Sequence, residues 1–144
     1  MAPLLTNPSS TPPLMSATRS FTRIDSIVLR VRSRQAAVAW YRSSLGLHLL
    51  FEDASAGMAV LGMGQGYSLT LWELRPGEEC AFDEKAGTFP IFEAVDARRQ
   101  RLDLQSRGVV TSELREAPGL RCFSFWDLDG NRLDACEVVE STPA

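Results

Sequence analysis

The feature that most constrains the fold of this 144-residue chain is an internal repeat with a period of about 64 residues. An apolar, alternating segment that contains Ile27 recurs around Ile91, 64 positions later. Each copy continues into a segment with helical periodicity that a glycine ends, Gly46 in the first copy and Gly108 in the second. Self-similarity at this period indicates two copies of one supersecondary unit, each too small to bury a good core alone.

Each copy is predicted to contain one strand, one helix and three further strands, which makes the chain α+β. Ser33 is a plausible N-cap for a helix over 34–45, and Asp96 can cap a helix that runs to about Ser106. The expected strands span 24–31, 47–53, 58–63 and 67–74 in the first copy and 89–95, 109–115, 121–127 and 131–138 in the second. Each helix would cover one face of a four-stranded sheet and leave the other face open.

Alternation along the strands predicts which side chains line the open faces. Ile27, Leu29 and Val31 share the helix-covered face of the first strand. The side chains expected on the open faces are Ser26, Val28, Arg30, Ser68, Thr70, Trp72, Pro90, Phe92, Ala94, Asp134 and Cys136. The same alternation places Glu93 under the second helix, where its carboxylate would need a partner such as an arginine of that helix.

The predicted organisation is a single domain between two tails. Residues 1–20 contain four prolines and seven Ser and Thr with few large apolar groups, so they are expected to be disordered. The domain is expected to span 21–140, with modules 22–74 and 89–138, an acidic linker over 75–88 and a C-terminal tail over 141–144.

Charge, hydropathy and cysteine usage exclude several classes of partner. The formal charge of −3 is too mild to indicate nucleic acid or an anionic membrane surface. No apolar run is long enough to span a membrane. The three cysteines, Cys80, Cys122 and Cys136, are odd in number and far apart in sequence. We therefore expect reduced thiols and a cytoplasmic protein.

Three motifs in order along this repeat resemble the vicinal oxygen chelate superfamily, which includes glyoxalases, bleomycin resistance proteins and extradiol dioxygenases. The motifs are IVLRV over 27–31, WYRSSLG over 40–46 and FWDLDGNRLD over 125–134. The resemblance covers about residues 22–140. It implies two βαβββ modules whose mixed sheets curl into an open cup, and a homodimer.

The resemblance also tests whether the cup could hold a metal. In metal-dependent members, four inward side chains from the first and last strands of each module ligate a divalent ion. The motif alignment places Ser26, Thr70, Pro90 and Asp134 at those positions. Only Asp134 is a strong ligand, because hydroxyls and a proline ring are poor donors for transition ions. The single histidine, His48, opens the second strand, away from this cluster. No metal and no other cofactor is therefore expected.

The leading hypothesis is a metal-free binding protein whose cup holds a small, partly aromatic molecule, as bleomycin-type resistance proteins do. The candidate ligand-binding residues are Ser26, Arg30, Thr70, Trp72, Phe92 and Asp134. No catalytic residue is assigned. Two alternatives remain open: a metal-dependent lyase, isomerase or dioxygenase with a non-standard site, and a partner-binding domain with a filled cup.

Each candidate side chain also has a structural interpretation. The Arg30 guanidinium could bind an anionic ligand group or form an ion pair with Asp134. Asp134 could pair with a cationic ligand, act as a base, or be satisfied by Arg30 or by backbone donors. Trp72 and Phe92 could stack on a planar ligand or fill the space between the sheets.

Overall fold

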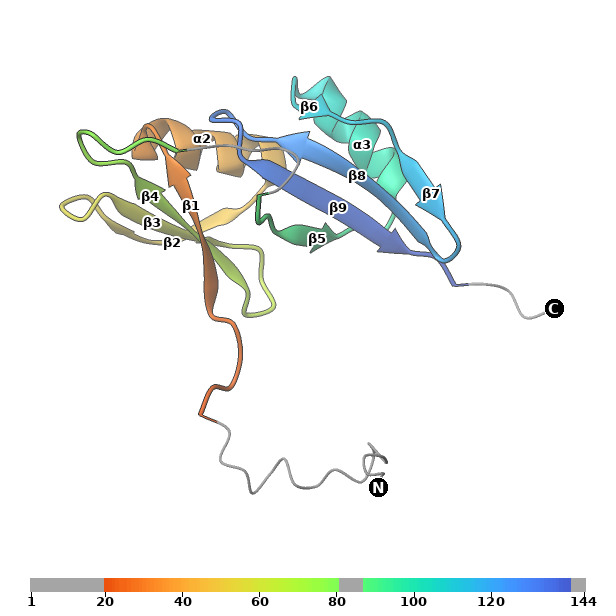
Figure 1. The fold of residues 1–144 in the computed structure, drawn as a ribbon, viewed down its shortest axis with the longest axis horizontal. Coiled ribbons are helices and arrows are strands. Elements are labelled where there is room, and N and C mark those ends of the chain that lie inside the picture. The colour runs from red at the N-terminus through yellow and green to blue at the C-terminus, as the bar shows by residue number, and fades with distance from the viewer. Residues whose placement is uncertain (1–19, 81–86, 141–144) are drawn as a thin grey trace.

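Two mixed sheets, each with one helix packed on the same side, make up the computed structural model of this protein (Figure 1). The structure describes residues 20–80 and 87–140. Almost all of both predicted tails and the middle of the predicted linker lie outside the described residues. Among the described residues, no helix has the length and apolar character needed to cross a membrane.

The first sheet has the strand order β1-β4-β3-β2, with β1 parallel to β4 and the other neighbours antiparallel. Its strands are β1 (Ser26–Val31), β2 (His48–Asp53), β3 (Met58–Gly62) and β4 (Ser68–Glu73). The helix α2 (Arg34–Leu45) connects β1 to β2. Ser33 caps it by accepting from the Ala36 amide at 3.2 Å, and Gly46 ends it with a φ of 73°. Both predicted caps of this helix are confirmed.

The second sheet has the order β5-β9-β8-β6, and β7 pairs with the free part of β8. Its strands are β5 (Ile91–Glu93), β6 (Val110–Thr111), β7 (Arg115–Ala117), β8 (Leu120–Trp126) and β9 (Arg132–Val138). The helix α3 (Ala97–Ser106) connects β5 to β6, and the Asp96 carboxylate accepts from the Arg99 amide at its start. The predicted second helix and its cap are confirmed.

The strand predicted over 109–115 is two short strands instead. Between them the Ser112 amide donates to the Ser124 carbonyl, but the Ser124 amide donates to the Ser112 hydroxyl at 2.8 Å. A side-chain oxygen thus replaces a backbone acceptor, so the regular ladder is interrupted at this point. Side chains that compete for backbone amides in this way leave no signal in an apolar pattern.

One apolar core lies between the helices and the covered faces of the two sheets. The largest fully buried side chains are Tyr41, Phe123, Leu61, Leu71, Leu104, Leu133 and Val31. The modules meet at a buried network in which the Asp127 carboxylate accepts from the Tyr41 hydroxyl at 2.6 Å. The same carboxylate accepts from the amides of Asp129 and Asn131 and from the Asn131 side chain. The WY and DGN motifs therefore hold the two modules together.

The register of β5 overturns part of the predicted open face. Val28 pairs with Thr70 in the first sheet, whereas Ile91 pairs with Asp134 in the second. The last strands of the modules are thus 64 residues apart, but the first strands are 63 apart. A one-residue slip turns every side chain of a strand to its other face, so the predicted position of Phe92 is wrong.

Phe92 packs against the core beneath α3, with its ring centroid 6.1 Å from that of Phe125. Ala94 also packs on the core rather than lining the open face. The slip turns Glu93 to the open face, which removes the difficulty of a carboxylate under the helix. In the register of the structure, Phe89 rather than Pro90 corresponds to Ser26.

The expectation of reduced thiols is wrong for two of the three cysteines. Cys122 and Cys136 stand opposite each other on β8 and β9, and their sulfur atoms form a disulfide. A hairpin lies between them, so residues 14 positions apart in sequence become direct neighbours. Cys80 is a free thiol, as expected.

Candidate functional site

The open faces of the two sheets form the candidate site, because both helices cover the opposite side (Figure 1). The predicted open face of the first sheet is confirmed by the pairing of Ser26, Val28 and Arg30 with Ser68, Thr70 and Trp72. Apolar side chains also lie on these faces without full burial: Val28 is 50% exposed, Phe51 61% and Ile91 60%. This face therefore combines apolar side chains with a few polar groups, which is the combination that binds small molecules in proteins.

We call the four positions at which the resemblance places metal ligands the corner positions. In the first module they are Ser26 and Thr70, whose hydroxyls form a hydrogen bond with each other. The Ser26 and Thr70 oxygens are 2.7 Å apart, and Ser26 also lies 3.4 Å from the Ser68 carbonyl. Thr70 is buried. Its hydrogen-bonding capacity is therefore directed at Ser26, and this corner is neutral.

In the second module, the corresponding corner is an arginine–carboxylate cluster. Arg132 donates to both oxygens of Asp134, at 3.0 and 3.2 Å, and Arg115 donates to one of them at 3.4 Å. The Asp134 side chain is 8% exposed. The Arg132 guanidinium also lies 3.9 Å from the centroid of the Phe89 ring, which fixes its position. Asp134 is therefore satisfied within the protein, but by these arginines rather than by Arg30.

These four corners do not fit a divalent metal. Asp134 is the single carboxylate, and its two oxygens already accept charge-assisted hydrogen bonds from arginine. Ser26 and Thr70 are poor ligands for transition ions, and the phenyl ring of Phe89 has no donor atom. His48 lies on β2, which β3 separates from β4 and its Thr70. Within residues 20–80 and 87–140, no three His, Cys, Asp or Glu side chains are grouped to hold a metal.

A second cluster lies where β1 and β4 end. The Trp72 ring has the Arg30 guanidinium 4.3 Å from its centroid and that of Arg75 at 5.2 Å. Arg30 forms an ion pair with Glu78 at 2.6 Å, not with Asp134, so that structural interpretation of Arg30 is wrong. The hydrogen bonds from the Arg75 amide and from Arg30 lower the pKa of Glu78, which is therefore ionised at neutral pH.

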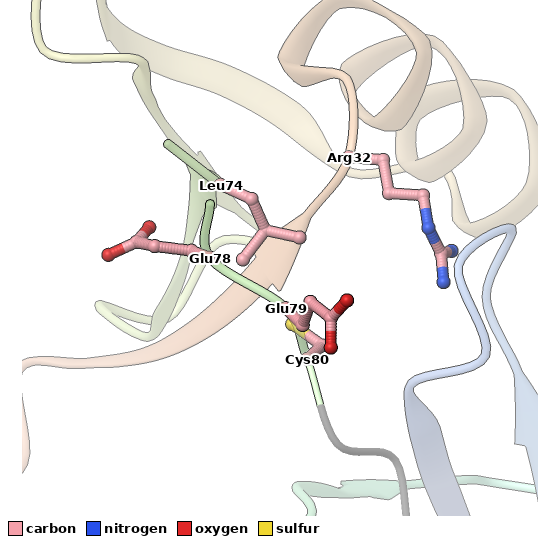
Figure 2. A pocket seen from close by; sticks show the side chains of 5 residues that line it. All are labelled: Arg32, Leu74, Glu78, Glu79 and Cys80. Atoms are coloured by element: carbon pink, nitrogen blue, oxygen red, sulfur yellow. The ribbon is translucent and has the colours of Figure 1, made fainter. Parts of the chain in front are cut away.

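A pocket of about 420 Å³ lies next to this cluster, where the chain leaves the first module. It is lined by Arg32, Leu74, Glu78, Glu79 and Cys80 (Figure 2). Figure 2 shows Arg32 directed toward the turn between β8 and β9, where it contacts the Asp129 carboxylate at 2.9 Å. Partial burial raises the pKa of the Cys80 thiol, so a smaller fraction of it is thiolate at neutral pH than in a free cysteine.

The sequence interpretation missed three charged residues of this face: Arg115, Arg132 and Glu78. The position of Arg132 could have been predicted, because residues two apart in a strand share a face and Arg132 precedes Asp134 by two. The positions of Arg115 and Glu78 could not have been predicted, because an irregular segment precedes β7 and Glu78 lies in a connecting loop. Such contacts depend on the tertiary path of the chain.

Comparison with known proteins establishes the fold but no closer kinship. No protein-family model and no curated protein sequence matches this chain. Among solved structures, a glyoxylase/bleomycin resistance protein/dioxygenase domain from Frankia superposes with a TM-score of 0.69 at 22% identity, covering 85% of this chain and 96% of that one. TnmS3, an antibiotic binding protein from Streptomyces, gives 0.69 at 20% identity, covering 83% and 98%. A lactoylglutathione lyase from Agrobacterium tumefaciens gives 0.65 at 17% identity, covering 83% and 96%.

Proposed function

We propose that this chain, which has the fold of the vicinal oxygen chelate superfamily, is a metal-free binding protein that holds a small, partly aromatic molecule on the open face of its sheets. The observation that carries the proposal is the state of the corner positions. Ser26 and Thr70 bind each other, and two arginines occupy the Asp134 carboxylate. The face keeps polar groups that can orient a ligand, but it lacks a donor set for a Lewis-acid metal.

The ligand would contact both polar and apolar groups on this face. Val28, Phe51 and Ile91 offer exposed apolar surface, and burying them under a ligand would favour binding by about 25 cal/mol per Å². Arg30 and Trp72, which are half-buried, would close one end of the site. The Ser26–Thr70 pair and Asp134 would line it. Phe92 is not proposed as a contact, because it belongs to the core.

Antibiotic binding by TnmS3 supports this assignment by analogy of fold, since that protein covers nearly the same length of chain. The metal-dependent lyase, isomerase or dioxygenase remains the competing hypothesis. A homodimer, with neither nucleic acid nor a membrane as partner, stays a prediction. The cytoplasmic location also stays a prediction, but the Cys122–Cys136 disulfide removes the reduced thiols from which it was inferred. Size-exclusion chromatography with light scattering measures the number of copies directly.

The first test is ligand screening by thermal denaturation. A library of aromatic metabolites, cationic glycopeptides and thiol conjugates is screened against the full chain and a Trp72→Ala variant. A ligand at 100 times its Kd should stabilise the native state by about 2.7 kcal/mol, which raises Tm by several degrees. The variant should lose most of this shift. A library in which no compound raises Tm would contradict the proposal.

Metal analysis separates binding from metal-dependent chemistry. Protein purified without chelator is analysed by elemental mass spectrometry beside an Asp134→Ala variant. We expect the same low, substoichiometric metal content in both proteins. About one bound ion per chain that disappears in Asp134→Ala would overturn the proposal in favour of the competing enzyme.

A further inference from the structure

Arg115 is a positioned cation on the open face of the second module. It stands opposite Cys122 in the pairing of β7 with β8, so it shares a face with Ser124 and Asp134. Its guanidinium donates to the hydroxyls of Ser112 and Ser124, each at 3.2 Å. Its side chain is nevertheless 50% exposed. Two hydroxyls fix the orientation of this guanidinium, and its exposed part can still donate hydrogen bonds to a further acceptor.

The positive charge of Arg115 is poorly compensated within the described part of the chain. Arg132 already forms a two-pronged ion pair with Asp134, whose oxygens lie 3.0 and 3.2 Å from its nitrogens. Arg115 reaches the same carboxylate with one longer contact of 3.4 Å. Its other partners are neutral hydroxyls, and no described residue accepts from its Nε–H.

The hydroxyls that hold Arg115 are themselves fixed. The Ser112 oxygen accepts from the Ser124 amide at 2.8 Å and donates to the Glu113 carbonyl at 2.9 Å. Ser124 is buried. Binding an anion would therefore require little reordering of the arginine, which reduces the entropic cost of the contact. The break between β6 and β7 at Ser112 is what places this hydroxyl beside the guanidinium.

We propose that Arg115, positioned by Ser112 and Ser124, is the anion-binding subsite of the open face, and that the ligand is an aromatic carboxylate rather than a cationic or neutral aromatic compound. This inference rests on the proposed binding function. The planar guanidinium matches the two oxygens of a carboxylate. A cationic ligand would find Asp134 already occupied and would meet the repulsion of two arginines.

The test compares 2-naphthoate with its neutral amide, 2-naphthamide, by isothermal titration calorimetry on the full chain. The two probes have the same aromatic body, so the difference in Kd reports the carboxylate alone. Three variants accompany the natural protein: Arg115→Gln, Arg115→Lys, and Arg98→Gln as a control. Arg98 is an arginine of similar exposure, 58%, that lies on α3 on the opposite side of the sheet.

We expect 2-naphthoate to bind at least about tenfold more tightly than 2-naphthamide, and less tightly as salt increases. Arg115→Gln should abolish this preference, Arg115→Lys should keep part of it, and Arg98→Gln should leave it unchanged. Equal Kd values for the two probes, or a preference that survives in Arg115→Gln, would overturn the carboxylate inference while binding itself stands. Absence of binding by both probes at millimolar concentration would count against the proposed function as well.

Discussion

The two modules follow the same chain path, yet their open faces have different chemistry. In the first module the corner of the sheet holds the neutral pair Ser26 and Thr70. In the second, the residue that corresponds to Thr70 is Asp134, and two arginines surround it. The covered faces of both sheets remain apolar and join one core. Packing thus requires apolar side chains on the covered face of each sheet, whereas the open faces of the two modules can differ in charge.

The strongest way to break this arrangement is to remove the carboxylate that joins the modules. In Asp127→Ala, the Tyr41 hydroxyl, the two backbone amides and the Asn131 side chain lose their acceptor in a buried site. Buried donors without partners cost about 1–3 kcal/mol each, and partial hydration reduces the sum. We expect the free energy of unfolding to fall by about 3–5 kcal/mol, measured by urea denaturation.

Asp103→Ala is the matched control, because Asp103 is exposed on α3. The Asp103 carbonyl accepts from the Ser106 hydroxyl, a bond that does not involve the side chain that is removed. This change should alter stability by less than about 0.5 kcal/mol. Similar losses in the two variants would mean that the modules are not held together through Asp127.

The disulfide gives a second contrast, since it cross-links strands of the second module while no cysteine lies in the described strands of the first. Cys122→Ser opens a loop of 14 residues, for which chain entropy predicts a loss of about 3 kcal/mol. Cys80→Ser, which removes the free thiol, should have a much smaller effect. Thiol titration of the denatured protein should find one reactive thiol without reductant and three with it. Three thiols without reductant would contradict the cross-link.

The comparison of the modules also shows how far the sequence could predict the structure. The helices, their caps at Ser33 and Asp96, and the open face of β1 and β4 follow from local patterns, and the structure confirms them. Phe92 was misplaced because the spacing of 64 residues was extended to a strand whose true offset is 63. An error of one residue is invisible in a short apolar segment, although it inverts both faces.

The candidate site was less accessible to sequence analysis than the fold. Ser26, Thr70 and Asp134 could be placed because an alternating strand determines the face of each residue. The partners of Asp134 and Arg30 could not, because Arg115 and Glu78 come from short or irregular segments whose position depends on tertiary packing. The Cys122–Cys136 pair likewise required the hairpin register, which residue spacing alone does not specify.

The corner residues themselves give the third contrast. Asp134→Asn leaves Arg132 and Arg115 beside each other without a carboxylate, and we expect a loss of about 2 kcal/mol, limited because both arginines are partly exposed. Thr70→Val, its counterpart in the first module, removes one partly buried hydrogen bond and should cost about 1 kcal/mol. Denaturant unfolding of both variants measures the difference. A greater loss in Thr70→Val would mean that the neutral corner is the more important one for stability.

The smallest expected effect is a loss of stability at high pH, caused by the Tyr41 hydroxyl that binds Asp127 between the two modules. Burial, and then the negative charge of Asp127, raise the pKa of Tyr41 above its ordinary value of about 10. In the unfolded chain the tyrosine ionises near pH 10, whereas in the folded protein it keeps its proton. The folded state therefore binds more protons above pH 10, and stability should fall by about 1.4 kcal/mol per pH unit there.

Unfolding at pH 9, 10 and 11 in a Cys80→Ser background, which removes the titrating thiol, should show this slope. Tyr41→Phe should lack it, because the difference between the two proteins reports the buried hydroxyl alone. Parallel profiles of unfolding free energy against pH for the two proteins would mean that Tyr41 ionises in the folded protein as easily as in water.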